Sequence, residues 1–490
     1  MSLNIQQKQT LNIVMITFWS QFSSYALNAI LILFLTRPLL EQGLGFSQAD
    51  AYSFMGISNA TGYLMPVLGG YVADRLLGLR RSILIGGLLL AIVYLLIMLS
   101  GYFIPIYGRG AFVATYALVP ACGSLLMGTA SGMVTRIYGD DVAHAKTAMT
   151  YYYMAINIGA LLSIFIAPSL LDSRFGPLSV LAITFIGKSI AALNFAYRYN
   201  IYDSIATPLD HQPMTKSAVL KLFTYLISIY IFTLCAYNFV NLFSVIISIG
   251  CLSAIGWFLA QSFLLEAEAR LKQFVACFLI FEAIVFFIIY NQMNSTLILF
   301  AQQNSDANFL GFTISPAQYK LLNPLLITII GSQLSKFYHR FPNFYIPYQF
   351  SIGTFLAGFS LLILAFASFN TTTGLINGNL IALTYIFITL AELFVSAIGL
   401  SMIGLYCHPQ TLGFAMGAWY LGSSISNILS GKIAHFVALP SKKTPPLESI
   451  SLFGHYYFSI GIVTLISAFI MLVLAFYLQR LFKQKNISFA

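Results

Sequence analysis

Long apolar segments alternate with short polar ones along the whole chain. Each apolar segment has about 20 or more residues, enough for a helix to cross a hydrocarbon core of about 30 Å. Because lipid cannot hydrogen-bond exposed backbone groups, such segments must be helices or strands of a closed barrel, and their uninterrupted apolar character favours helices. The pattern predicts fourteen membrane spans, near residues 11–36, 50–73, 81–102, 111–136, 147–171, 178–198, 216–236, 239–265, 273–302, 315–337, 343–367, 379–407, 411–437 and 454–483.

The composition agrees with an all-α membrane protein. Of the 490 residues, 59% are hydrophobic and only 8% are charged, whereas an ordinary soluble domain has about 25% charged residues. Lys8 is the one charge before the first apolar segment, and no small-residue cleavage site precedes it, so no cleavable signal is expected. No nucleophile–base constellation and no cofactor motif is evident, so we expect neither an enzyme nor a bound cofactor. The five cysteines are scattered without metal-type spacing and are expected to be core residues, with no metal site.

The net charge of +10 is concentrated in alternate loops. This is the distribution expected of cytoplasmic loops under the positive-inside rule, and it argues against a nucleic-acid partner. An even number of spans then places both termini in the cytoplasm, with a bacterial inner membrane as the expected location. The basic residues of these loops are Arg75, Arg80 and Arg81; Arg136 and Lys146; Lys216 and Lys221; Arg270 and Lys272; Lys336 and Arg340; and Arg480, Lys483 and Lys485.

The spans divide into six, two and six. We expect an N-terminal bundle over residues 1–198, a linker with an inserted helix pair over 199–272, and a C-terminal bundle over 273–490. Two six-helix halves resemble the major facilitator class of transporters, which implies a substrate site between the halves near the middle of the bilayer.

Residues 69–81, GGYVADRLLGLRR, form the sharpest motif and lie between the second and third predicted spans. They resemble the major-facilitator loop signature and, more closely, its oligopeptide-transporter form GG-x-x-AD-R-x-x-G. Glycines permit close helix approach, and an acid here can meet a basic side chain or the positive end of a helix. We therefore expect a latch that governs gating; the alternative is a charged loop that only fixes topology. Its residues are Gly70, Asp74, Arg75, Arg80 and Arg81.

Further motifs run through both halves in a consistent order. The chain is identified by them as a member of the proton-dependent oligopeptide transporter family, whose bacterial branch carries an inserted helix pair. The matching segments are YLMP at 63–66, YYMAINIG at 152–159, YNQMNSTL at 290–297, NP at 323–324, ELFVSAIGLS at 392–401, and MGAWYL at 416–421 followed by Ser423 and Asn427.

The charged residues of the family's transport cavity are missing. Its first helix begins E-x-x-E-R and carries a second arginine, its fourth helix has a lysine, and its seventh has an acid. Removing one member of a buried ion pair costs about 3–5 kcal/mol, whereas neutralising both members can be nearly free. The loss of acidic and basic residues together favours a cavity adapted to another purpose over a random loss of cavity charges. The corresponding positions here are Thr17, Ser20, Gln21, Asn28, Met127 and Asn291.

Glu392 is the remaining carboxylate at a family position. A carboxylate inside a membrane helix costs at least about 2.5 kcal/mol and usually faces a cavity or a partner. The resemblance implies that it receives the amino end of a peptide, and it is also the expected proton-coupling residue; the alternative is a structural acid. Glu282 and Lys188 match no family site, and Lys188 is in a helix expected on the outside of its bundle. The predicted substrate-binding residues are Tyr25, Asn28, Tyr63, Asn157, Gln292, Asn323, Glu392, Trp419 and Ser423.

These features predict a secondary transporter that moves a small organic solute by alternating access. The resemblance implies proton-driven uptake of di- and tripeptides. Because the cations that would bind a peptide carboxylate are missing, a peptide-like or amine-containing solute is expected. The alternatives are import or export of a non-peptide solute such as a siderophore, and a sensor that does not transport. The expected partners are the solute, the lipid bilayer and protons as a candidate coupling ion, with the chain as a monomer.

Overall fold

The computed structural model describes residues 4–126, 129–139, 141–341, 344–408, 411–440 and 444–487, and nearly all of them are helical. The chain forms two compact units. The first comprises Met1–Phe46 and Thr61–Val240, and the second comprises Ser47–Ala60 and Asn241–Ala490. Helix α2 (Gln48–Val72) therefore begins in the second unit and ends in the first.

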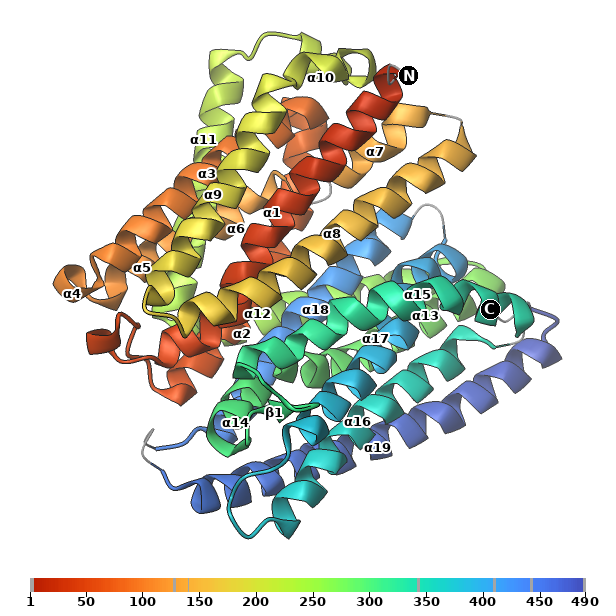
Figure 1. The fold of residues 1–490 in the computed structure, drawn as a ribbon. Coiled ribbons are helices and arrows are strands. Elements are labelled where there is room, and N and C mark those ends of the chain that lie inside the picture. The colour runs from red at the N-terminus through yellow and green to blue at the C-terminus, as the bar shows by residue number, and fades with distance from the viewer. Residues whose placement is uncertain are drawn as a thin grey trace. The chain divides into compact units, whose positions relative to one another are not determined.

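In the first unit, α1 packs against α8 and α9, and α3 packs against α9 (Figure 1). Helix α1 starts with a capping box, because the Asn4 side chain accepts a hydrogen bond from the backbone N–H of Gln7 and the Gln7 side chain bonds back to Asn4. The elements are α1 (Ile5–Thr36), η1 (Leu39–Glu41), η2 (Ala73–Leu77), α3 (Leu79–Tyr102), α4 (Ile104–Tyr107), α5 (Arg109–Tyr116), α6 (Leu118–Ser124), α7 (Thr129–Tyr138), α8 (Val142–Leu171), α9 (Gly176–Tyr197), η3 (Tyr199–Ile205), α10 (Pro208–His211) and α11 (Lys216–Asn238).

Two spans predicted as continuous helices are interrupted. The span near 111–136 is divided into α5, α6 and α7. Pro120 accounts for the first break, because its ring clashes with the carbonyl four residues earlier, at Tyr116, where α5 ends. The span near 273–302 is divided into α13 (Ala267–Tyr290), the short 3-10 turn η5 (Asn291–Asn294) and α14 (Thr296–Asn304).

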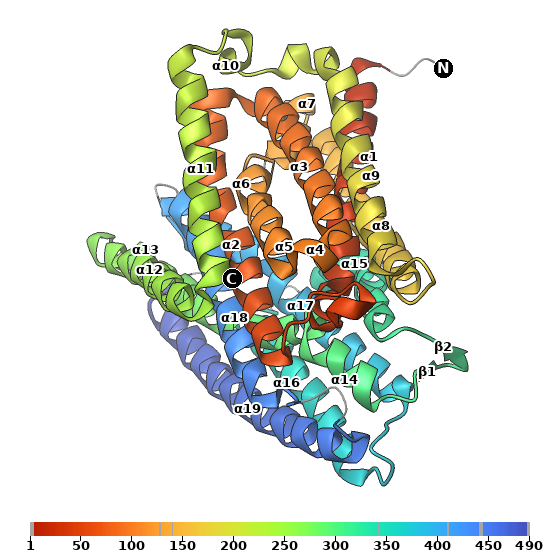
Figure 2. The same ribbon diagram turned by 90° about the vertical axis from the view of Figure 1, so that its left-hand side faces the viewer.

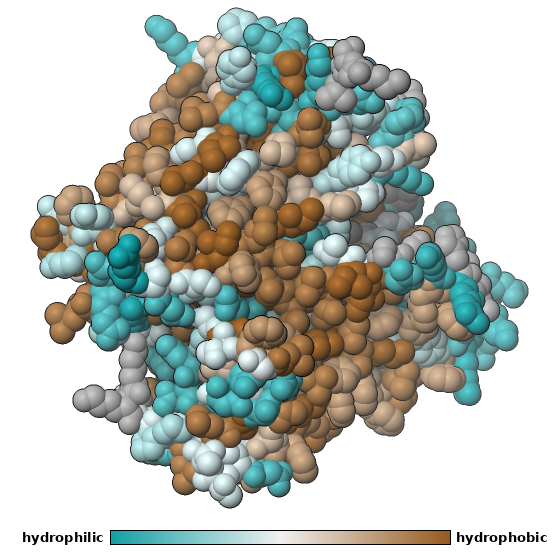
Figure 3. Space-filling view, viewed as in Figure 1, coloured by the Kyte–Doolittle hydropathy of each residue, from teal (hydrophilic) through white to brown (hydrophobic). Residues whose placement is uncertain are grey.

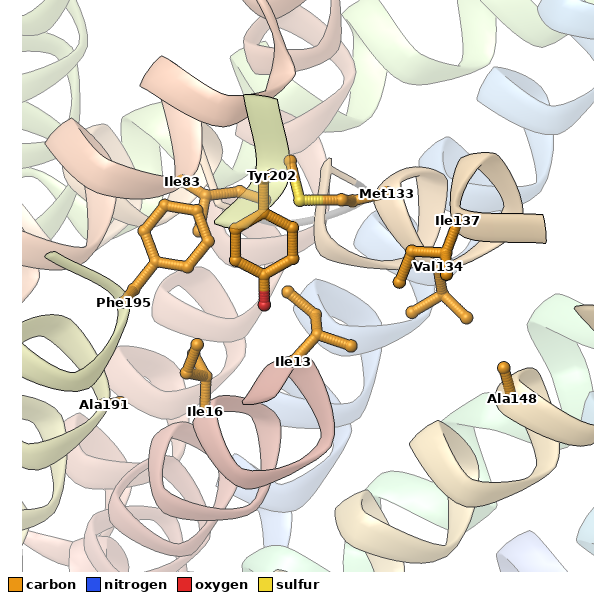
Figure 4. Packing of buried hydrophobic residues seen from close by; sticks show 10 residues of the cluster. All are labelled: Ile13, Ile16, Ile83, Met133, Val134, Ile137, Ala148, Ala191, Phe195 and Tyr202. Atoms are coloured by element: carbon orange, nitrogen blue, oxygen red, sulfur yellow. The ribbon is translucent and has the colours of Figure 1, made fainter. Parts of the chain in front are cut away.

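A cluster of buried apolar residues lies where α1, α3, α7, α8 and α9 meet near η3 (Figure 4). Tyr202 from η3 stacks on Phe195 with ring centroids 5.2 Å apart. Burial raises the pKa of Tyr202, and its hydroxyl donates to Asn12 Oδ1 at 2.7 Å. The polar segment after α9 is thereby fixed to the start of α1.

The second unit contains the remaining helices, and α16 and α19 lie side by side along much of their length (Figures 1 and 2). One detail differs from the all-helical expectation: β1 (Asn308–Phe309) pairs antiparallel with β2 (Phe312–Thr313) in a small hairpin (Figure 2). The other elements are α12 (Val240–Gln261), η4 (Ser262–Leu264), η6 (Pro316–Leu321), α15 (Leu322–Arg340), α16 (Ile346–Asn370), α17 (Gly378–Tyr406), α18 (Leu412–Ala434), η8 (His435–Val437) and α19 (Pro446–Gln484).

Eleven helices among the described residues are long and apolar enough to cross a membrane. The other three predicted spans are also helical and correspond to α2, to η6 with α15, and to α18. In Figure 3, apolar side chains cover much of the visible helical surface, and polar ones gather near α10 and the N-terminus. The chain is therefore a multi-pass, all-α membrane protein.

The turn between α11 and α12 consists of Phe239 alone and allows a direct test of topology. We expect reporter fusions after residues 210, 238 and 270 to report cytoplasm, periplasm and cytoplasm, because basic loops flank the inserted pair on one side. A periplasmic signal at 210 or 270 would contradict the six-two-six topology.

Candidate functional site

Glu392 projects from α17 toward the first turn of α15. Asn323 Nδ2 donates to Glu392 Oε2 at 2.6 Å and lies 3.2 Å from Thr389 Oγ1. Thr389 and Glu392 are three residues apart on α17 and therefore share one face. Tyr290, the last residue of α13, also hydrogen-bonds the Glu392 side chain. Neutral groups from two other helices thus hold the carboxylate, and Glu392 as a whole residue is partly buried.

A lysine also acts on this carboxylate. Lys320 is in η6, three residues before Asn323, and only 7% of it is exposed. Its ammonium and the Glu392 carboxylate interact electrostatically. Lys320 was not predicted as a site residue, because it matches none of the motifs and lies near the end of a predicted span. Its position three residues before the Asn-Pro pair is the only signal that could have indicated it.

Trp419 from α18 is the aromatic residue of the predicted set in this unit. It is buried, and its ring lies 5.8 Å from that of Phe287 and 6.3 Å from that of Phe350. A Cβ atom at Gly399 would lie 2.1 Å from the indole, so only glycine allows α17 to approach it this closely. Ser423 Oγ donates to the Trp419 carbonyl on its own helix at 3.2 Å. Trp419 is thereby fixed between α13, α16 and α17.

Gln292 is fully buried in the η5 turn, and both ends of its amide bind within the second unit. Its Nε2 donates to Ser430 Oγ at 2.8 Å, and its Oε1 accepts from Thr296 Oγ1 at 2.7 Å and from Tyr456 at 3.0 Å. These bonds join η5 to α18 and α19. The hydrogen bonds of this amide hold the η5 turn in place between α13 and α14. Tyr290 is the last residue of α13, directly before this turn.

In the first unit, Lys188 of α9 is buried against α1, with only 5% of it exposed. Its Nζ donates to the Ser20 carbonyl at 2.8 Å, to Ser20 Oγ at 2.9 Å and to Ser24 Oγ at 2.8 Å. The Tyr94 ring centroid is 5.2 Å from the same nitrogen. A cation therefore lies beside Ser20, one of the α1 positions at which the sequence analysis found a charge missing.

The predicted gating residues separate into two groups. Gly70, Asp74 and Arg75 are at the end of α2 and in the π-helical turn η2, with Asp74 and Arg75 exposed. Within the described ranges, no ion pair includes Asp74. Arg80, in contrast, is 6% exposed, and its Nη1 lies 2.7 Å from Asp203 Oδ1.

Asp210, in α10, fixes the start of α3 and was not predicted. Its carboxylate accepts from the backbone N–H of Arg81 at 2.9 Å, and the Arg81 guanidinium donates to the Asp210 carbonyl at 2.6 Å. Gly78 has a φ of +85°, and a Cβ there would lie 2.5 Å from Asp210 Oδ1, so glycine is required on both grounds. The loop motif is thus bound to the segment after α9.

The chain matches the POT family over residues 80–450. Among curated relatives, dipeptide and tripeptide permease A of Klebsiella pneumoniae is 30% identical over 468 residues, covering 95% of this chain and 91% of the relative. Dipeptide and tripeptide permease B of Photorhabdus asymbiotica is 32% identical over 490 residues, covering 98% and 97%. The chain belongs to the POT family.

Solved structures of POT proteins have the same fold. Tetrameric PepTSo2 superposes with a TM-score of 0.83 at 24% identity, and the match covers 97% of this chain and 99% of that one. A peptide transporter POT in complex with sulfate gives 0.83 at 22% identity, with 98% and 99% covered. The fold is therefore the major facilitator fold, and this POT member is a secondary transporter and not an enzyme.

The remaining predicted positions of this POT chain are in the first unit, except Asn291, which is in the second. Asn157 of α8 donates to the Tyr153 carbonyl of its own helix at 2.9 Å. Tyr63 is 37% exposed on α2, and Tyr25 and Asn28 are partly buried on α1. Thr17 is buried on α1, Gln21 is partly buried, and Asn291 in η5 is partly buried. Met127, aligned with the lysine of the fourth helix, is outside the described residues.

The exposed Asp74 allows the latch to be tested without disturbing packing. We expect Asp74→Asn to slow transport several-fold while solute affinity changes little, because a latch biases the equilibrium between conformations and does not contact the solute. Transport rate and binding affinity measured on the same purified variant check this. Loss of both in equal measure would argue against a latch.

Proposed function

We propose that this chain imports a peptide-like or amine-containing solute across the inner membrane and that Glu392 with Asn323 receives the solute ammonium. The observation that carries the proposal is the 2.6 Å bond between Asn323 Nδ2 and Glu392 Oε2. The neutral Asn323 amide holds the carboxylate in one orientation, and Glu392 as a whole residue retains some exposure.

Lys320 gives the site a cation of its own. A carboxylate in a membrane helix is costly when unpaired, and the Lys320 ammonium offsets part of that cost through its charge. A solute ammonium can take over this role when it binds. The carboxyl end of a peptide-like solute would then be attracted by Lys320, which supplies a cation that the motif positions lack.

The strength of this recognition can be estimated. A hydrogen bond to a charged group contributes about 1.5–3 kcal/mol, and about 1.4 kcal/mol corresponds to a tenfold change in affinity. An amine-bearing solute should therefore bind roughly 10–100-fold more tightly than its N-acetylated analogue. The names of the curated relatives, dipeptide and tripeptide permeases, support peptides as the first solutes to test.

Proton coupling follows from the same carboxylate. A proton and a solute ammonium both neutralise Glu392, so they compete for one site. Thr17, Ser20 and Asn291 carry no titratable group in the accessible range. We propose that Glu392 accepts a proton when the solute leaves, in a chain that works as a monomer with both termini in the cytoplasm.

A thermal-shift screen of purified protein tests the recognition step, because a solute that binds the native state raises apparent stability. Di- and tripeptides should raise the melting temperature of the wild type, and their N-acetylated forms should not. Glu392→Gln should remove the difference within each pair. Equal shifts for both members of a pair, or shifts only with solutes that have no amine, would contradict the proposal.

A further inference from the structure

Lys188 is a buried ionisable group that the proposed recognition of solute by Glu392 does not use. It is in α9, and its close contact with α1 depends on the residue before it. A Cβ atom at Gly187 would lie 2.3 Å from Ser23 Oγ and 3.2 Å from the Trp19 carbonyl. Glycine therefore lets the two helices approach closely enough for the Lys188 side chain to reach the α1 backbone.

The Lys188 ammonium has a complete set of neutral acceptors. A lysine ammonium has three donors, and all three are used, on the Ser20 carbonyl, Ser20 Oγ and Ser24 Oγ at 2.8–2.9 Å. The face of the Tyr94 ring at 5.2 Å adds a cation–π contact. Within the described parts of the chain, no acidic side chain forms an ion pair with Lys188.

Other charges on the helices packed against α9 lie toward their ends. Lys8 is exposed in the first turn of α1, and His144 and Lys146 are exposed in the first two turns of α8. Arg80, at the start of α3, is paired with Asp203. The titratable group that faces Lys188 is therefore Tyr94, whose hydroxyl bonds Ser24. A charge on Lys188 is compensated by dipoles and one aromatic ring, and not by an opposite charge.

A cavity of about 20 Å³ adjoins the ammonium, lined by Ser20 and Lys188 together with apolar residues of α1, α3 and α9 such as Ile16, Leu90 and Phe195. A space of at least about 10–15 Å³ can hold one water molecule when polar groups bind it. Ser20 Oγ and Lys188 Nζ both border this cavity. Because all three donors of Lys188 are in use, a water here binds Nζ only in exchange for one of the bonds to α1. A water in this cavity could take a proton from Lys188 or return one to it.

We propose that Lys188 is a proton-binding site of the transport cycle, separate from Glu392, and that its ammonium form fastens α9 to α1. In one step the ammonium gives a proton to water and becomes the neutral amine. The amine has two donors in place of three, so at least one bond to α1 is lost and the contact between α1 and α9 loosens. In the reverse step a proton from solution restores the ammonium and the contact. The proposal rests on the proposed function of the chain as a transporter.

A direct titration tests proton binding without transport. Protein labelled with ¹³C at lysine Cε should give one NMR signal that is absent from Lys188→Gln and present in Lys221→Gln, in which an exposed lysine of α11 is changed. That signal should move between the ammonium and amine positions across the pH range of the transport assay. A signal that stays at one position throughout would overturn the proposal.

Transport in proteoliposomes tests the role in coupling. A pH gradient of one unit can drive about tenfold accumulation when one proton accompanies each solute. Lys188→Gln, which cannot titrate, and Lys188→Arg, which keeps a permanent charge, should both lose this accumulation and keep exchange of labelled for unlabelled solute. If Lys188→Arg keeps full proton-driven accumulation, Lys188 has only a structural role as a cation, and the proposal is wrong. If the wild type moves no solute at all, the proposed function fails, and the titration alone still decides whether Lys188 binds a proton.

Discussion

Replacing Glu392 by glutamine should remove the contribution of this carboxyl group to the pH dependence of uptake and weaken binding of amine-bearing solutes by about 10–100-fold. The second effect follows from the loss of about 1.5–3 kcal/mol for a hydrogen bond to a charged group. The first follows because glutamine keeps the shape of the side chain but cannot bind a proton in the working range. Uptake by proteoliposomes, measured as a function of pH with an amine-bearing dipeptide and its N-acetylated form, checks both effects in one series.

Glu282→Gln is the matched control for this experiment. Glu282 is another acid of the second unit, buried on α13 with 1% of it exposed, and it matches no family site. We expect Glu282→Gln to keep the discrimination between the two solutes. If Glu392→Gln retains full proton-driven accumulation, Glu392 is not the coupling residue and Glu282 becomes the next candidate.

Replacing Asp210 by alanine should give the largest loss of stability among changes in the loop segments. The carboxylate accepts from the Arg81 backbone N–H, from the Thr207 backbone N–H at 2.9 Å and from Thr207 Oγ1 at 2.8 Å. It is 4% exposed and lies at the N-terminus of α3, where a negative charge is favourable. We expect a loss of about 2–3 kcal/mol, because several charge-assisted bonds are removed and buried donors are left unpaired.

The melting temperature in detergent, measured beside that of Asp74→Asn, checks this expectation. Asp74 is exposed five residues before α3, so its substitution should change stability by no more than about 0.5 kcal/mol. Asp210→Asn, which keeps one carbonyl oxygen, should fall between the two. Equal melting temperatures for Asp210→Ala and Asp74→Asn would show that the segment after α9 does not stabilise the start of α3.

The fold was predictable because each membrane helix carries its own signal. An apolar segment of sufficient length must form a helix in lipid whatever its neighbours are, and the motifs then identified the family. The interruptions were harder to predict. Pro120 marks one of them in the sequence, but the break at η5 depends on Ser430 and Tyr456, which bind Gln292 from distant helices.

The candidate site was predictable only where a motif marked it. Glu392 and Asn323 were both predicted from motifs, without knowledge of how the helices pack, and they bind each other. Lys188 and Lys320 match no motif, and their roles depend on which helices surround them. The sequence therefore indicates a cavity without cations, whereas the part of the chain that the structure describes has a buried lysine in each unit, Lys188 and Lys320.

Counterflow in proteoliposomes tests the central claim most directly, since it needs only solute exchange by the purified wild type. Vesicles loaded with an unlabelled dipeptide should take up the labelled dipeptide transiently above its external concentration, and vesicles loaded with the N-acetylated form should not. Binding of the dipeptide in the thermal-shift screen without any counterflow would contradict the account and indicate a receptor that does not transport.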